Sequence, residues 1–128
     1  MRRLKGRILG FEEIEDFLIE STFGDESPFR LLRAENKPLA FVLVNPYAII
    51  DEYSFEVDER ILERDLGIKK DLQSLAVMCI VRIEEDKLFV NLRAPLLVNT
   101  DTGRFCQILL ENDRYGVSVP FAVKNMDR

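Results

Sequence analysis

The sequence of 128 residues contains no histidine and no tryptophan. Without histidine there can be no Ser-His-Asp triad, no Cys-His pair, no histidine metal site and no imidazole pH switch. A general acid or base would have to be a carboxylate, lysine, tyrosine or cysteine whose pKa is tuned by its surroundings. The missing histidine therefore excludes most of the common catalytic designs.

Cysteine is also scarce, and the two that occur, Cys79 and Cys106, lie in apolar runs without metal-binding spacing. Two cysteines are too few for a disulfide framework, so we expect buried free thiols, as in a reducing cytoplasm. The apolar runs, such as Leu75–Val81, are far shorter than the ~20 residues of a membrane helix, and no signal peptide is visible. We therefore expect a soluble, cytoplasmic protein with no membrane partner.

The six glycines are dispersed, and none forms a phosphate-binding loop that opens a helix after a strand. The acidic stretch Asp51–Asp58 lacks the glycine and the terminal glutamate of an EF-hand loop. Pairs of carboxylates are frequent, as in any acidic protein, but nothing in the sequence marks a pair as buried. We predict no catalytic residue, no metal ligand and no cofactor.

Acidic side chains outnumber basic ones by 23 to 18, for a formal net charge of −5. Nucleic-acid binding usually requires a basic surface, so we expect no direct contact with nucleic acid. The acids concentrate in two runs, Phe11–Ser27 and Asp51–Asp65. Such runs either solubilise the protein or attract a basic partner. The acidic candidates for a functional surface are Glu12, Glu13, Asp16, Asp51, Glu52 and Glu56.

The length predicts a single domain over residues 1–128, and the apolar segments are short and rich in β-branched or aromatic residues. A helix is predicted near residues 58–66, because Asp58 suits an N-cap and Gly67 suits the left-handed position after a helix. With one short helix, the chain should be all-β: a small antiparallel β-barrel-like fold or a sandwich. The expected strands are Leu4–Leu9, Phe17–Ser21, Phe29–Ala34, Leu39–Val44, Tyr53–Val57, Leu75–Ile83, Lys87–Ala94, Leu96–Asn99, Arg104–Leu110 and, after a turn at Asn112-Asp113, Tyr115–Val119, which Pro120 should end.

Three asparagines lie in or at the ends of predicted strands, where asparagine is uncommon: Asn45, Asn91 and Asn99. The simpler interpretation is that each amide caps a backbone turn. The functional interpretation is that each fixes a loop or an edge that a partner contacts. Phe89 lies on the polar side of its alternating strand, so it either packs beneath a neighbouring segment or belongs to an interface.

Four stretches together resemble the FliW-type flagellar assembly factors, in an order and spacing that cover about residues 8–121. They are LGFE ending at Glu12, Ser27-Pro28-Phe29 leading to Leu32, FVLVNP at Phe41–Pro46, and NLRAPLLVN at Asn91–Asn99. The last string is the most specific of the four.

The resemblance implies a non-enzymatic protein with a small β-barrel-like fold, which we also expect to be a monomer. Similar proteins bind CsrA, an RNA-binding translational regulator, and relieve its repression of flagellin mRNA translation. They also bind flagellin, and the two partners exclude each other. The resemblance therefore suggests a partner-binding surface at the motif positions Asn45, Pro46, Asn91, Pro95 and Asn99, with Phe89 as an additional apolar contact.

The alternative is a small-molecule binder or a carboxylate-dependent hydrolase at the mouth of a barrel, the usual ligand site of that architecture. It predicts a deep pocket that holds at least two acids with raised pKa. A direct nucleic-acid binder ranks third, on the strength of the basic stretch Arg2–Arg7.

Overall fold

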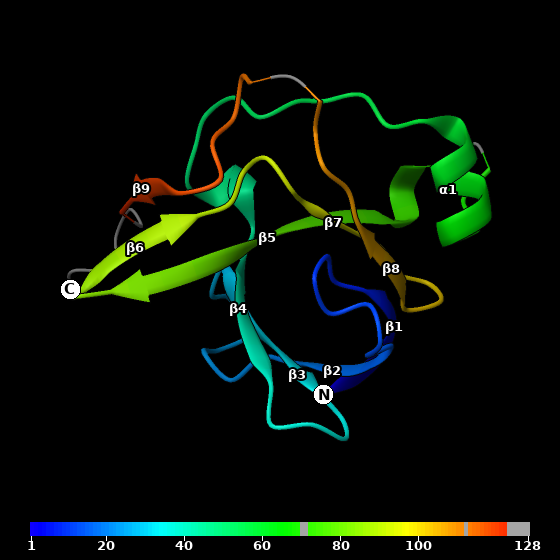
Figure 1. Ribbon diagram of the computed structural model, residues 1–128, viewed down its shortest axis with the longest axis horizontal. Coiled ribbons are helices and arrows are strands. Elements are labelled where there is room, and N and C mark those ends of the chain that lie inside the picture. Colours follow the sequence, from blue (N-terminus) through cyan, green and yellow to red (C-terminus); the bar gives the residue numbers. More distant parts are fainter. Residues whose placement is uncertain (70–71, 112, 123–128) are drawn as a thin grey trace.

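The computed structural model describes residues 1–69, 72–111 and 113–122, so part of the turn expected at Asn112 lies outside the described residues. Most of the regular structure is β (Figure 1). The strands are β1 (Arg2–Arg7), β2 (Asp16–Glu20), β3 (Phe29–Ala34), β4 (Ala40–Val44), β5 (Leu75–Glu84), β6 (Lys87–Val90), β7 (Leu96–Asn99), β8 (Arg104–Gln107) and β9 (Val119–Phe121). The helices are α1 (Glu59–Leu66) and the 3-10 turns η1 (Pro46–Ala48) and η2 (Leu72–Ser74).

Seven strands close into a barrel in the order β4-β3-β2-β1-β8-β7-β5, because β4 also pairs with β5. The long strand β5 leaves the barrel at its far end, where it pairs with β6, and β9 adds to the edge of β6 (Figure 1). The all-β barrel prediction is confirmed. All strand pairs are antiparallel except β1 and β8, which run parallel.

The parallel seam requires a very close approach of two backbones. A Cβ atom added at Gly6 of β1 would lie 2.0 Å from the carbonyl oxygen of Phe105 in β8. Only glycine avoids this contact, so Gly6 is a requirement of barrel closure.

The apolar core has three parts. The barrel interior contains Phe17 and Leu32, both fully buried. A second cluster, around Tyr53 and Cys79, lies between the outer face of the sheet and the chain that follows η1. In the third, α1 packs on β7 and β8, burying Cys106. Both cysteines are free and buried, as predicted, and burial raises the pKa of the Cys79 thiol to about 12.

The two ends of the barrel differ. At one, which we call the closed end, residues 8–15 pack their apolar side chains against the barrel core, and Phe11 meets Phe41 edge to face at 5.4 Å between ring centroids. At the other, which we call the mouth, strands β1, β3 and β5 begin and strands β2, β4 and β7 end. At the mouth, the described residues that line the opening include two charged side chains, those of Arg2 and Arg30.

The predicted helix is confirmed together with both of its caps. The Asp58 carboxylate accepts a hydrogen bond from the Arg60 amide at 2.8 Å, and Gly67 adopts the left-handed conformation with φ of 71°. The Arg60 side chain and amide also lower the pKa of Asp58.

The predicted strand over Tyr53–Val57 is wrong. These residues are extended and bury Tyr53, but they pair with no strand in the described structure. The phenol of Tyr115 takes the place of a partner strand: its oxygen accepts from the Ser54 amide at 3.0 Å and donates to the Ser54 carbonyl at 3.2 Å. An alternating pattern thus reports one buried face and does not guarantee a sheet partner.

Four other strands differ from the prediction by more than one residue at a boundary. β1 spans Arg2–Arg7 rather than Leu4–Leu9, because the chain turns after it, where the Phe11 amide donates to the Ile8 carbonyl. β6 ends at Val90 rather than Ala94, because the Asn91 side chain turns the chain. β8 ends at Gln107 rather than Leu110. β9 begins at Val119 and contains Pro120, which was expected to end a strand; an outermost strand tolerates proline because one side of it needs no amide donor.

Candidate partner-binding groove

A groove of about 820 Å³ lies between two irregular segments, residues 54–58 and residues 108–111. Figure 1 shows both segments crossing the same side of the barrel, one leading into α1 and the other leaving β8. Its apolar lining is Phe55, Val57, Ile61, Ile108, Leu109 and Leu110, and its charged lining is Glu56, Asp58, Glu111 and Arg114.

The first wall of the groove is held by tyrosine side chains. The Tyr53 phenol donates to the Leu92 carbonyl at 2.6 Å, and its burial, together with the nearby Cys79, raises its pKa far above that of a free phenol. Ser54 is held by Tyr115, and Asp58 then starts α1. The backbone of this wall is therefore anchored at both ends.

The second wall is held by backbone hydrogen bonds. The Ile108 amide donates to the Pro95 carbonyl at 3.0 Å, and the Leu110 amide donates to the Arg93 carbonyl at 2.8 Å. Leu109 lies between these two anchors and is 60% exposed. Leu109 therefore adds exposed apolar surface to the groove.

The charge of the groove is predominantly acidic. Of its three carboxylates, Asp58 forms an ion pair with Arg60 at 3.0 Å. Neither Glu56 nor Glu111 has a basic side chain within ion-pair distance in the described part of the chain. The groove thus combines apolar surface with uncompensated negative charge, which suits a basic partner with an apolar contact residue.

The three predicted asparagines all cap turns. Asn45 accepts from the Tyr47 amide at 3.0 Å. Asn91 accepts from the amides of Arg93 and Ala94, both at 3.1 Å.

Asn99 is the most deeply placed of the three, at 4% exposure. Its amide donates to the Leu66 carbonyl at 2.8 Å and accepts from the amides of Asp101 and Thr102. It therefore fastens the end of α1 to the mouth of the barrel. The geometry matches the simpler interpretation of these asparagines, and their role in partner binding stays a prediction.

The motif prolines and Phe89 are not part of the groove. Pro46 and Pro95 are fully buried. Phe89 is partly buried beneath the Arg82 guanidinium, whose central carbon lies 4.4 Å from the ring centroid, and Pro120 stands opposite it on β9. Phe89 thus packs under neighbouring residues, the first of its two interpretations.

The acidic candidates do not form one surface. Glu12, Glu13 and Asp16 lie at the closed end, where the Glu12 side chain accepts from the Gly10 amide. Glu56 lines the groove, and Asp51 and Glu52 are exposed on the chain that leads to it. Sequence reasoning missed the second wall, although the three successive apolar residues at 108–110 were a usable signal, since a strand cannot bury all three on one face.

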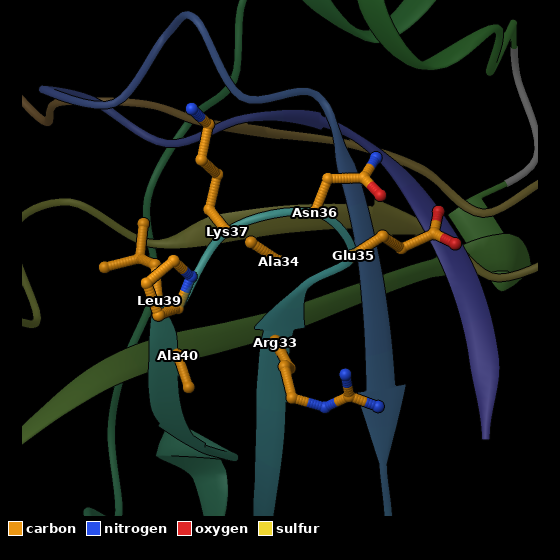
Figure 2. Close-up of a pocket in the computed structure, with 8 residues that line it drawn as sticks. Arg33, Ala34, Glu35, Asn36, Lys37, Leu39 and Ala40 are labelled. Atoms are coloured by element: carbon orange, nitrogen blue, oxygen red, sulfur yellow. The ribbon is translucent and has the colours of Figure 1, made fainter.

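A second hollow, of about 570 Å³, lies beside the turn between β3 and β4. Figure 2 shows Arg33 and Glu35 extending to one side of the view and Lys37 in another direction, so the three side chains do not meet at a common centre. This hollow therefore offers no convergent set of polar groups.

Within residues 1–69, 72–111 and 113–122, no three Cys, Asp or Glu side chains are grouped as metal ligands would be. In the same residues, no helix has the length and apolar character needed to cross a bilayer.

A closed seven-stranded barrel, with one helix at its side and a strand pair extending from it, defines the class as a small β-barrel protein. A family model described as FliW protein matches residues 2–121. The chain belongs to the FliW family of flagellar assembly factors.

Individual relatives agree over most of the chain. The flagellar assembly factor FliW of Caldanaerobacter subterraneus subsp. tengcongensis is 36% identical over 116 residues, covering 88% of this chain and 76% of its own. That of Caldicellulosiruptor bescii is 38% identical over 111 residues, covering 84% of this chain and 70% of its own. A crystal structure of the flagellar assembly factor FliW superimposes with a TM-score of 0.81 at 30% identity, covering 95% of this chain and 86% of that one.

Proposed function

We propose that this protein is a non-enzymatic, cytoplasmic binding module that antagonises CsrA and so relieves the repression of flagellin mRNA translation. It also binds flagellin, in a mutually exclusive way, and acts as a monomer without binding nucleic acid directly. Membership of the FliW family supports the flagellar role. The observation that carries the proposal is the groove, in which exposed apolar surface meets the carboxylates of Glu56 and Glu111.

The physical basis of the antagonism is electrostatic. A protein that binds RNA presents a basic surface, because neutralising phosphates supplies much of the affinity. An acidic groove attracts such a partner, and the bound acidic protein then raises the work of bringing a phosphate backbone close to it. A coupling of ~1–3 kcal/mol between the two binding events would lower the RNA affinity by about 5- to 150-fold.

The carboxylate-dependent hydrolase has less support. Its expected site, the barrel mouth, is lined by no aspartate or glutamate in the part of the chain that the structure describes. The acids with altered pKa in that part, Glu20 and Asp58, have lowered values caused by arginine partners. A general acid near neutral pH needs the opposite shift.

The first test is titration of the purified protein into CsrA and into flagellin by calorimetry. We expect a complex of micromolar or tighter affinity with each, and displacement of one partner by the other. The absence of such a complex with both partners would refute the proposal. Filter binding of RNA at low salt should show no retention by this protein alone.

The second test places the interface. Leu109→Ala should weaken partner binding by about fivefold or more, since truncating an apolar side chain at the centre of an interface is expected to cost about 1 kcal/mol or more. Ile83→Ala is the matched control, because Ile83 is 61% exposed and lies on β5 outside the groove. Equal affinity of the two variants would exclude the groove as the interface.

The third test concerns charge. Reversal of Glu56 and Glu111 to lysine should reduce the displacement of RNA from CsrA more than it reduces the stability of the fold. Reversal of Glu12 and Glu13, at the closed end, is the comparison. If the two double variants reduced the displacement of RNA equally, the excess of acidic residues would serve solubility and not this interface.

A further inference from the structure

The mouth of the barrel holds a cavity of about 350 Å³, a size within the range of small-molecule sites. Its apolar part is formed by Leu4, Ile19, Ala76, Met78 and Val98. Its rim carries Arg2 and Arg30 together with neutral polar residues. The cavity is separate from the groove, with which it shares no lining residue.

Both arginines belong to the inward-facing side of their strands. On β3, Arg30 alternates with the outward Leu31 and shares its side with Leu32, which is fully buried in the barrel. On β1, Arg2 shares its side with Leu4, at 4% exposure. Arg2 is exposed and Arg30 is partly buried, so both arginines stand at the rim, at the strand ends that open onto the cavity.

Arg30 is held in place without being neutralised. Its Nη1 donates to the carbonyl oxygens of Ser27 at 2.6 Å and Phe29 at 2.8 Å, and its Nη2 donates to that of Asp25 at 3.1 Å. These acceptors are neutral carbonyls, so the positive charge persists. Across the described residues, no carboxylate lies within 4.0 Å of the guanidinium of Arg30 or Arg2. A guanidinium has five N–H donors, so Arg30 keeps some for a ligand.

The floor of the cavity is apolar surface that stays partly exposed to solvent. Ile19, Ala76 and Met78 point into the barrel core and yet are only partly buried, whereas Phe17, nearer the closed end, is fully buried. A ligand that covered these side chains would gain the free energy of removing apolar surface from water. The positive charge of Arg30 at the rim and the exposed apolar floor together favour a ligand with an anionic head and an apolar tail.

We propose that the barrel mouth is a binding site for a small aliphatic carboxylate, with its head on Arg30 and Arg2 and its tail on Met78 and its neighbours. The planar fork of a guanidinium matches a carboxylate in a bidentate arrangement. The site is independent of the groove, so its occupancy is measurable without either protein partner.

The test uses octanoate, below its micelle concentration, titrated into the purified protein by calorimetry and by NMR. We expect saturable binding of one octanoate per chain, with resonances of residues at the mouth shifting. Acetate supplies the head alone and octanol the tail alone, and each should bind at least about tenfold more weakly than octanoate. No saturation with octanoate, or equal binding of octanol, would overturn the proposal.

Variants identify the two halves of the site. Arg30→Met keeps an aliphatic chain but removes the charge, and should weaken octanoate binding by about tenfold or more. Arg33→Met is the matched control, because Arg33 lies on the same strand but faces outward to Glu20. Since Arg30 also anchors residues 25–29, Arg2→Met provides a second test of charge at an exposed residue that anchors no loop.

The apolar half is tested by filling it. Ala76→Leu adds side-chain volume to the cavity floor and should reduce octanoate binding while leaving the rim charges unchanged. Undiminished binding by Ala76→Leu, or by both arginine variants, would place octanoate elsewhere and overturn the proposal. Binding of CsrA or flagellin by these variants should be unaffected, so failure here leaves the proposed function standing.

Discussion

The two ends of the barrel are stabilised by different interactions. At the closed end, order comes from apolar packing: Ile8 is buried, and Phe11 and Ile14 cover the core. At the mouth, order comes from hydrogen bonds made by polar side chains, with Arg30 holding three carbonyls and Asn99 holding the end of α1. Apolar packing fills space, whereas hydrogen bonds fix positions without filling it. The mouth can therefore be rigid and open at the same time.

The largest effect should come from the packed interior near the closed end. Phe17 is fully buried and meets Phe105 edge to face, with ring centroids 5.6 Å apart. Phe17→Ala should lower the free energy of unfolding by about 3–5 kcal/mol, measured by urea denaturation. Met78→Ala, at the partly exposed mouth, should cost less, because part of that side chain already contacts water. Equal costs would mean that the two ends do not differ in packing.

An intermediate effect should come from the hydrogen bonds of the mouth. Asn99→Ala leaves the Leu66 carbonyl and the amides of Asp101 and Thr102 without their partner. We expect a loss of about 1–3 kcal/mol in the free energy of unfolding. Asn45→Ala removes a single cap on an exposed turn and should cost about 1 kcal/mol or less. If Asn45→Ala were the more damaging change, hydrogen bonding by Asn99 would not be what orders the mouth.

The smallest change in the free energy of unfolding should come from an ion pair on the outer wall of the barrel. Arg33 donates a hydrogen bond to Glu20, with 3.2 Å between Nη2 and Oε1, and this contact lowers the pKa of Glu20. Because the folded-state pKa lies below the unfolded one, the contribution to stability is present above the ordinary glutamate pKa and is lost as the pH falls through the lowered value.

Glu20→Gln should therefore reduce stability slightly at pH 7 and flatten the loss of stability on acidification. The measurement is the urea midpoint at pH 7 and at pH 3. A profile of Glu20→Gln as steep as that of the parent would show that the pair contributes nothing.

The sequence was sufficient for features that depend on neighbouring residues. Strand β3 has the predicted bounds, and Asp58 and Gly67 cap α1 as expected, because caps and short strands are local. The turn at residues 101–103 joins β7 to β8, between the strands predicted to end at Asn99 and to begin at Arg104. The resemblance to the FliW family added the expectation that the strands form a small barrel.

What the sequence could not provide was contact between distant segments. Nothing in Tyr53–Val57 indicates that a phenol from residue 115 would replace a partner strand. Likewise, the groove requires residues 54–58 to meet residues 108–111, and the mouth requires Arg2 to stand beside Arg30. Each depends on barrel closure, which no local pattern encodes.

The parallel seam between β1 and β8 also has a consequence for synthesis. Lys5 pairs with Arg104, so the first strand emerges from the ribosome long before the strand that it needs. Until then β1 can pair only with β2, and its other edge stays open to water and to other chains. Barrel closure therefore waits for β8, and pairing between strands so far apart in the sequence slows folding. The nascent protein should be most prone to aggregation in the interval before β8 is released.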